Sequence, residues 1–472
     1  MKAKFKSSAA LVTGVHDGHS IERDTLRRVT WRIMPLLTVT YIVAWLDRVN
    51  VGFAALQMNR DLGFSAAVYG FGAGIFFIGY ALCEIPSNLA LCRFGARRWI
   101  ARIMITWGLL SASMIFVRSS ASFYVMRFLI GVAEAGFFPG IIFYLARWYP
   151  EAQRAKAIGW FMVAVPLASM IGGPIAGLLL DLGGKLGLAG WQWLFVAEGV
   201  PAVLLAWVVL RYLPEEPSAA RWLPATGREW LTGKLQKERA VCDERHHVSL
   251  RETLRHPIIW QLGVINFLAQ MGTYGLTLWL PQILKTLSGL SDLRVGFYSG
   301  LPYVAAALAM IFVGAHSDRS GERCGHIALS FFFAACGFLA SGFVQSTPLM
   351  MLALTAVAMG THGRNGPFWA LPCHFLSGRA AAVGIALINS VGSLGGFVGP
   401  YAIGVAKSAT GTFVGGQCFL AIALLLAGAL SLRLRRAEAL RPVLVEQAHA
   451  PPRMPYLSHI WVAMERCASR QR

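Results

Sequence analysis

Two pairs of charged residues stand in stretches of sequence that are otherwise apolar. Arg127 and Glu134 lie seven residues apart in FYVMRFLIGVAEAGFFPGIIFYLA, and Asp47 and Arg48 are neighbours in YIVAWLDRVNVGFAA. A charged side chain at the centre of a membrane helix costs about 2.5–3.5 kcal/mol on insertion scales. Charges retained at such a cost are typical of proton and ion pathways. These four residues are therefore the leading candidates for chemistry.

The spacing of Arg127 and Glu134 places them on one face of a helix, two turns and about 10 Å apart. They are too far apart to pair directly, so each needs another partner or water. One hypothesis is a proton site at which Glu134 titrates and Arg127 modulates its proton affinity. The alternative is a charge network that only stabilises the helix packing.

Asp47 and Arg48 point about 100° apart around their helix, so they face different surroundings. Arg48 is our candidate for binding a carboxylate, because a guanidinium binds carboxylates through two parallel hydrogen bonds and keeps its charge. Asp47 is a second candidate proton carrier. The alternative is an Asp–Arg pair that only fixes helix packing. Asn50, one turn from Asp47, bonds either a ligand or the backbone of another helix.

Composition indicates the elements that hold these residues. The chain has 472 residues, of which 56% are hydrophobic and 14% charged. The apolar residues come in runs of about 20, the length that a helix needs to cross a bilayer. Such segments must be helical, because lipid offers no partners to the backbone. We predict twelve spans, near 33–56, 68–91, 99–117, 123–146, 157–180, 193–213, 258–284, 293–316, 326–344, 348–376, 380–405 and 413–432.

The net charge of +20 does not indicate nucleic-acid binding, because the Lys and Arg residues gather in alternate loops. This positive-inside pattern predicts that both termini and the central loop are cytoplasmic. The eight cysteines are scattered without the spacing of a metal site or a disulfide framework. We expect no metal and no organic cofactor.

We predict an all-α membrane protein of two six-helix bundles. Its parts are a cytosolic tail 1–30, a first bundle 31–213, a cytoplasmic linker 214–257, a second bundle 258–436 and a cytosolic tail 437–472. Thr226 and Glu229 predict a capping box in the linker, before a short helix with Trp230 and Leu231 on its apolar side. The halves have similar motifs at matching positions: RFGARR in the first and SDRSGER in the second, and likewise IGGPIAG and GFVGPYAIG. Such repeats are typical of transporters built from two bundles.

Several longer motifs resemble one family. They are YIVAWLDRVNVGFAALQMNRDLGFS, FGAGIFFIGYALCEIPSNL, RFLIGVAEAGFFPGIIFYLARWYP, FWALP and GIALINSVGSLGGFVGP. With them the chain resembles the major facilitator superfamily over nearly all of residues 28–437. Within it the chain is similar to the anion:cation symporter family, in the branch of bacterial tartrate-type and 4-hydroxyphenylacetate-type permeases. The resemblance implies a multi-pass transporter of the bacterial inner membrane that acts as a monomer.

The resemblance also implies roles for particular residues. It implies proton coupling for Arg127 and Glu134, beside which Asp47 remains the second candidate proton carrier, and gating for Arg93, Asp318 and Arg319. With Arg48 and Asn50, it implies substrate contacts for Tyr80, Tyr274 and Asn389; the alternatives are a core aromatic for each tyrosine and helix–helix hydrogen bonding for each asparagine.

The chain departs from this branch in a few places. Cys92 stands before Arg93 where relatives have a carboxylate, and either the first gate is weaker or Glu151 compensates. Ser393 replaces a second asparagine and leaves room for altered substrate contacts. Arg364 either clamps a second carboxylate or snorkels toward the periplasmic face. His374 senses pH or bonds a substrate hydroxyl.

Two acidic residues near the spans are expected to be structural. Glu84 precedes Pro86 and is expected to satisfy backbone donors freed near the helix break. Glu198 is expected to play a comparable role.

We expect a proton-coupled symporter, not an enzyme, that imports a small organic carboxylate such as tartrate or a related sugar, hydroxy or aromatic acid. Its partners are the anion, protons and the bilayer, with no nucleic acid. One rival is an exporter or antiporter of the same fold, since IGGPIAG resembles a motif found in antiporters. A second, a membrane sensor or enzyme, lacks any supporting output domain or catalytic cluster in the sequence.

Overall fold

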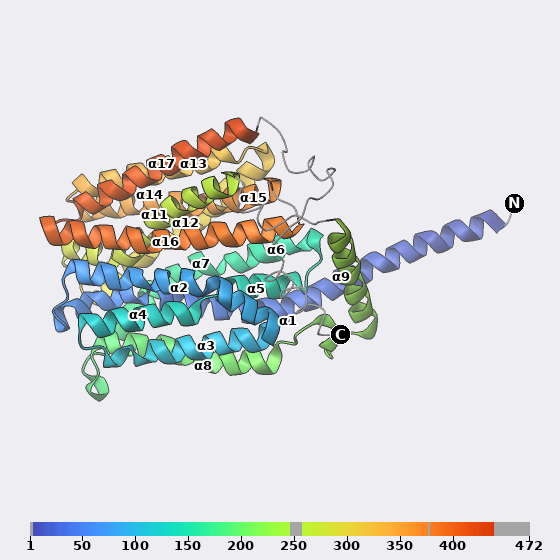
Figure 1. Ribbon diagram of the computed structural model, residues 1–472, viewed down its shortest axis with the longest axis horizontal. Coiled ribbons are helices and arrows are strands. Elements are labelled where there is room, and N and C mark those ends of the chain that lie inside the picture. The colour runs from blue at the N-terminus through green and yellow to red at the C-terminus, as the bar shows by residue number, and fades with distance from the viewer. Residues whose placement is uncertain (1–2, 246–256, 376–377, 439–472) are drawn as a thin grey trace, which may run out of the picture.

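The protein is a bundle of long helices arranged side by side along one axis (Figure 1). The computed structural model describes residues 3–245, 257–375 and 378–438, and those residues contain no strand. The α-helices of the first half and linker are α1 (Ala3–Asp61), α2 (Ala66–Phe94), α3 (Ala96–Ala112), α4 (Ser120–Glu134), α5 (Phe137–Ala146), α6 (Glu151–Met162), α7 (Ala164–Leu180), α8 (Gly190–Tyr212) and α9 (Ala225–Arg245). Short 3-10 turns are η1 (Ser113–Phe116), η2 (Lys185–Gly187) and η3 (Pro217–Ala219). The second half contains α11 (Pro257–Ser288), α12 (Asp292–Ser320), α13 (Cys324–Phe343), α14 (Thr347–Gly363), α15 (Asn365–Phe375), α16 (Gly378–Thr410) and α17 (Val414–Glu438).

Within the described residues, each of the twelve predicted spans falls mainly on helix, and residue 376 of the tenth lies outside them. Ten helical stretches of the described residues are long and apolar enough to cross a membrane. The two remaining predicted spans are 258–284, which lies within α11, and 348–376, which is divided into α14 and α15 at Arg364. The helices are therefore consistent with the predicted twelve, although the tenth span is not one continuous helix.

The segment that contains Arg127 and Glu134 is also divided, which the prediction of one helix over 123–146 missed. The break follows Glu134, where Gly136 adopts φ 84° between α4 and α5. Only glycine takes this left-handed conformation without a steric cost. The hydroxyl of Ser87 on α2 donates to the carbonyl oxygen of Ala135 at 2.6 Å, so the buried carbonyl at the break has a partner. The break leaves Glu134 at the end of α4.

The first helix is longer than its predicted span. α1 begins at Ala3, so the predicted tail 1–30 is largely helical, and its first part projects beyond the bundle at the end where α9 lies (Figure 1). Gln153 donates to the Glu22 carboxylate at 2.9 Å, and the Tyr149 hydroxyl donates to Thr30 at 3.0 Å. These bonds anchor the extension to the connection between α5 and α6.

The linker helix α9 begins one residue before Thr226, so the predicted capping box at Thr226 is wrong. The backbone N–H of Arg228 instead donates to the carbonyl of Pro224 in an ordinary helical turn. Leu231 is buried, which confirms the predicted apolar side of this helix.

The two halves, α1–α8 and α11–α17, meet along three helix pairs: α2 with α16, α7 with α12, and α1 with α11. Glycines permit close backbone approach in these pairs. A Cβ added at Gly70 of α2 would lie 2.7 Å from the Pro400 carbonyl oxygen and 3.2 Å from the Gly404 Cα, both on α16. Small residues are the usual means by which membrane helices pack closely.

The connection between α12 and α13 is held by Glu322. Its carboxylate accepts hydrogen bonds from the backbone N–H of Gly325 at 2.5 Å and of His326 at 3.2 Å. It also pairs with the His326 ring at 2.9 Å. Partial burial opposes ionisation of Glu322, but these hydrogen bonds prevail and lower its pKa below the ordinary value of 4.5.

We expect Gly70→Ala to lower the thermal unfolding midpoint, because its methyl group meets backbone atoms that cannot turn aside. Overpacking of this kind costs about 1–3 kcal/mol. Thermal unfolding in detergent measures the change. Gly159→Ala is the matched control, since nothing lies within 4 Å of a Cβ added there. Equal midpoints for the two variants would contradict the close packing of α2 and α16.

We expect Glu322→Gln to reduce thermal stability at neutral pH and to have no effect in strong acid. The depressed pKa means that ionised Glu322 adds stability above its ordinary value of 4.5, and that this stability is lost as pH falls through the folded-state value. Unfolding midpoints measured across pH 3–7 test this, with the exposed Glu229→Gln as control. A pH-independent difference would indicate that the charge of Glu322 plays no part.

Candidate functional site

The centre of the molecule contains a buried ion pair between α1 and α4. Arg48 donates to Glu134 Oε1 through Nε at 3.1 Å and through Nη2 at closer range. Arg48 is 8% exposed and Glu134 is fully buried. The remaining Nη1 of Arg48 donates to the Tyr274 hydroxyl of α11 at 3.3 Å. One guanidinium thus joins a carboxylate of the first half to a hydroxyl of the second.

Aromatic rings enclose this guanidinium. The Arg48 Cζ lies 5.1 Å from the ring centre of Tyr80, 5.6 Å from that of Phe76 and 5.8 Å from that of Trp45. Aromatic faces attract a cation at such distances, and more strongly when water is absent. Tyr80, expected as a substrate contact, therefore lies against the central cation.

Arg127 occupies a different place from the one we expected. Its Nη2 donates to the Ala73 carbonyl oxygen of α2 at 3.5 Å, and its Cζ lies 5.0 Å from the Phe76 ring centre. Its Nε and Nη1 lack hydrogen-bond partners among the described residues. As the spacing predicted, Arg127 and Glu134 form no ion pair in the described part of the chain, but the cation next to Glu134 is Arg48.

Asp47 faces away from Arg48 toward α3. Its Oδ1 accepts a hydrogen bond from the Ser111 hydroxyl and a longer one, 3.4 Å, from the Asn50 amide. Its Oδ2 is buried and has no partner among the described residues. Ser111 was missed in the sequence, since a serine within an apolar helix carries no signal of its partner. Glu198 on α8 is also buried, with an unpartnered Oε2 in the described structure.

Glu84 forms the other polar link between the halves near the centre. Its carboxylate accepts from the Asn389 amide at 2.7 Å and from the Ser390 hydroxyl at 2.6 Å, both on α16. The expected role of Glu84, bonding backbone donors near Pro86, is therefore wrong. Asn389, expected to contact substrate, is engaged by Glu84 in this conformer. Ser390 was not anticipated.

Arg364 lies at the break between α14 and α15 and is 2% exposed. Its Nη1 donates to Asn266 Oδ1 of α11 at 3.0 Å, and its Cζ lies 4.9 Å from the Phe368 ring centre. The alternative in which Arg364 snorkels to the periplasmic face is wrong, because the guanidinium is enclosed within the second half. No carboxylate of the described residues pairs with it. The side chain of His374 lies outside those that the structure describes.

The expected gate residues lie at the ends of α2 and α12, away from Asp47, Arg48 and Glu134. Asp318 pairs with Arg323 at 3.2 Å rather than with its neighbour Arg319, which is exposed. The Arg93 Cζ lies 5.7 Å from the ring centre of Phe94.

A carboxylate from the linker, that of Glu215, bonds the connection between α2 and α3, a few residues after Cys92. Glu215 accepts from the backbone N–H groups of Ala96 at 2.5 Å and Arg97 at 3.2 Å, which caps the start of α3. Arg147 lies 3.8 Å from the same carboxylate. The alternative in which Glu151 compensates is not seen, since its side chain is exposed and forms no ion pair with a described residue. In the sequence, the two glutamates of PEEP, which include Glu215, were the feature that could have indicated this carboxylate.

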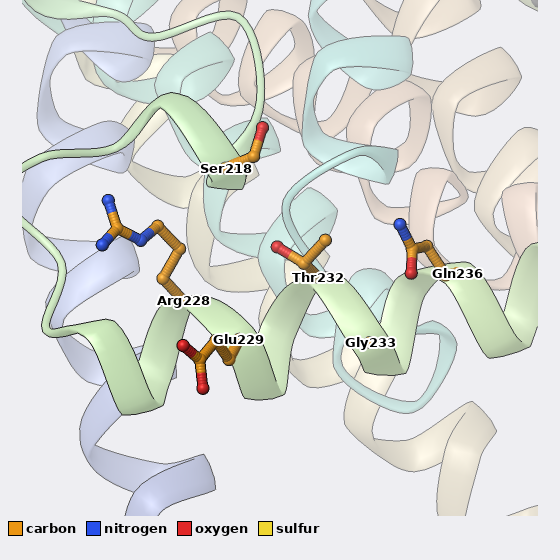
Figure 2. A pocket seen from close by; sticks show the side chains of 6 residues that line it. All are labelled: Ser218, Arg228, Glu229, Thr232, Gly233 and Gln236. Atoms are coloured by element: carbon orange, nitrogen blue, oxygen red, sulfur yellow. The ribbon is translucent and has the colours of Figure 1, made fainter. Parts of the chain in front are cut away.

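Two cavities of the described structure are lined by residues other than the buried charges. A small cavity of about 10 Å³, room for about one water, lies between the halves and is lined by Val49, Phe53, Ser169, Gly172, Gly173, Thr277, Leu280 and Tyr303. A larger pocket of about 370 Å³ lies on the linker, between η3 and α9 (Figure 2). It is lined by Ser218, Arg228, Glu229, Thr232, Gly233 and Gln236, and none of the candidate site residues is among them.

Comparisons with known proteins agree with this architecture. Residues 37–400 match the model of the Major Facilitator Superfamily. A protein of Agrobacterium vitis, provisionally named a tartrate transporter, is 48% identical over 420 residues, which cover 89% of this chain and 93% of the relative. A quinolone resistance transporter of Acinetobacter baumannii is 44% identical, covering 86% and 93% respectively.

The fold is similar to that of a solved bacterial homologue of the human lysosomal transporter Spinster in an inward-facing, unoccupied conformation. The TM-score is 0.71 at 19% identity, covering 89% of this chain and 98% of that one. The helical bundle, the family model and the relatives agree with one another. The chain therefore belongs to the major facilitator superfamily, in the branch of the tartrate-transporter-like proteins, and is a multi-pass membrane transporter rather than an enzyme.

Proposed function

We propose that the protein is a proton-coupled symporter that imports a small organic carboxylate across the bacterial inner membrane. The observation that carries this proposal is the buried pair of Arg48 and Glu134, which Tyr274 extends into the second half. The pair offers one anion-binding cation and one titratable group in direct contact. The name of the Agrobacterium relative supports tartrate, or a related sugar, hydroxy or aromatic acid, as the substrate.

The contact between these two residues provides a physical basis for coupling. Glu134 occupies the donors of Arg48 that a substrate carboxylate would use. If the anion replaced an ionised Glu134, two negative charges would face one cation in a site without water, at a large electrostatic cost. A proton on Glu134 removes that cost and frees the guanidinium. Binding of the anion and uptake of a proton therefore favour each other.

Asp47 is the proposed second proton carrier, since one of its carboxylate oxygens is buried without a partner in the described structure. Arg127 supplies a compensating positive charge, because two of its nitrogens are unpartnered there as well. Tyr80, Tyr274, Asn50 and Asn389 are the proposed polar contacts of the substrate in the conformer that admits it.

Arg364 and His374 extend the proposed substrate site into the second half. Arg364 is a buried cation that donates a hydrogen bond to the neutral side chain of Asn266. An anionic group would stabilise it in a way that the amide does not. We assign the second acidic or hydroxyl group of a substrate to this region.

The remaining parts of the proposal concern the transport cycle. Arg93, Asp318 and Arg319 serve as gate residues at the cytoplasmic side, and the protein acts as a monomer. The cycle uses protons as the coupling ion and needs no metal or organic cofactor. Moving one charge through the membrane potential contributes about 2.3 kcal/mol per 100 mV.

An exporter of the same fold is the second candidate. The name of the Acinetobacter relative, a quinolone resistance transporter, favours it. The direction of net movement separates the two. Uphill uptake of labelled L-tartrate into proteoliposomes with an acidic exterior would support the importer, and proton-driven extrusion of a quinolone would support the exporter.

We expect Glu134→Gln to abolish proton-driven accumulation of L-tartrate and to retain exchange of L-tartrate across the membrane. The amide keeps the size and an acceptor oxygen of Glu134 but takes up no proton. Accumulation and counterflow in proteoliposomes measure the two activities. The exposed Asp181→Asn serves as control. Accumulation at the wild-type level would remove Glu134 from the coupling mechanism.

We expect Arg48→Lys to weaken binding of L-tartrate by about 100-fold, equivalent to about 2.7 kcal/mol. Lysine keeps the charge, and so stabilises Glu134, but lacks the planar fork that binds a carboxylate through two bonds. Calorimetric titration of purified protein measures the affinity, with the exposed Arg98→Lys as control. An unchanged affinity would exclude Arg48 as the anion contact.

A further inference from the structure

Glu84 is a buried carboxylate for which the proposed symport cycle has no use. We propose that Glu84 is a latch between the two halves: its carboxylate stabilises the conformer in which α2 and α16 lie together here, and it releases α16 when the halves exchange conformers. The latch is a positioning role for Glu84 and is independent of the identity of the substrate.

The two hydrogen bonds that Glu84 accepts from described side chains both cross between the halves. Glu84 is 1% exposed. Oε1 accepts from the Asn389 amide at 2.7 Å and Oε2 from the Ser390 hydroxyl at 2.6 Å. Among the described residues no cation forms an ion pair with it. The side chain of Glu84 is therefore held by donors of α16 that the first half does not replace.

The latch lies well away from the close packing of α2 and α16. Close backbone approach at Gly70 and Gly74 marks that packing toward the end opposite α9. Glu84 is about 21 Å further along α2 than Gly70, at a rise of 1.5 Å per residue. The two bonds of Glu84 therefore join α2 to α16 at a point that the glycine contacts do not reach.

The latch is also connected to the central cation. Tyr80 precedes Glu84 by one helical turn, and its ring centre lies 5.1 Å from the Arg48 Cζ. A movement of α2 that separates Glu84 from α16 therefore shifts a wall of the central site as well. Transporters of this architecture alternate by moving one bundle against the other. Such a movement costs the two hydrogen bonds wherever α2 and α16 separate, which makes Glu84 a determinant of the conformational equilibrium.

The test measures conformer populations in the absence of any anion. Spin labels at Arg98→Cys and Arg433→Cys, both exposed toward the α9 end and in different halves, report the distance between the halves. The background lacks the eight native cysteines. We expect Glu84→Ala to raise the ratio of the alternative distance population to the original one by about tenfold, as loss of roughly 1.4 kcal/mol would do.

A double-mutant cycle separates the latch from general packing. Asn389→Ala/Ser390→Ala removes the donors and is expected to produce a similar shift, and adding Glu84→Ala to it should produce no further one. Glu84→Gln keeps one acceptor oxygen and is expected to give an intermediate shift. Ser393→Ala is the matched control on α16, because that hydroxyl donates only to the Asn389 carbonyl of its own helix.

Unchanged distances in Glu84→Ala, or shifts that add in the cycle, would overturn the latch. If Glu84→Ala does not fold, the Asn389→Ala/Ser390→Ala variant decides the question alone, since its wild-type side chains are partly exposed. The outcome is distinguishable from that of the proposed symport, because no substrate or proton gradient enters the measurement.

Discussion

A guanidinium buried at the centre of an apolar bundle is unstable unless it is neutralised and hydrogen-bonded, and the centre of this protein is organised around that requirement for Arg48. Glu134 supplies the opposite charge, Tyr274 accepts the remaining hydrogen bond, and three aromatic rings replace water around the group. The break after Glu134 belongs to the same arrangement, because it ends α4 at the residue that meets Arg48. Glu134 thus both neutralises Arg48 and forms the end of α4.

The two halves contribute unequally to this centre. Asp47, Arg48, Arg127 and Glu134 all lie in the first half, which therefore holds both the cations and the titratable groups next to them. The second half contributes neutral donors and acceptors through Tyr274, Asn389 and Ser390. Neutral partners are less costly to separate from a charge than an opposite charge is, so the interface between the halves can open while the ion pair of the first half stays intact.

Packing between the halves follows the same division of roles. Toward the end opposite α9, glycines bring backbones into contact, and hydrogen bonds such as that from the Tyr69 hydroxyl to the Leu278 carbonyl accompany them. Near the centre, the contacts include the hydrogen bonds of Arg48 and Glu84 across the halves. A protein that alternates between two conformers needs both kinds: close packing that makes each conformer distinct, and polar contacts that allow charge to influence the balance between them.

The sequence by itself determined the positions of the spans, the charges within them and the family. Each follows from information carried locally along the chain: runs of apolar residues, the cost of a charge in lipid, and motifs such as WLDRVN and RFLIGVAEAG. Periodicity also predicted that Arg127 and Glu134 do not pair, since two turns separate them. The predictions were less successful where a helix is interrupted, as at Gly136 and Arg364, because one glycine or polar residue barely alters the hydropathy of a span.

Only the tertiary structure decided which charges meet. Residues 86 positions apart form the central ion pair, Glu84 bonds residues 305 and 306 positions away, and Glu215 rather than Glu151 serves the connection after α2. Nothing local distinguishes these partners from other polar residues at the same depth. Helix contacts depend on how whole bundles pack, and a buried charge takes whichever partner that packing brings within hydrogen-bond distance.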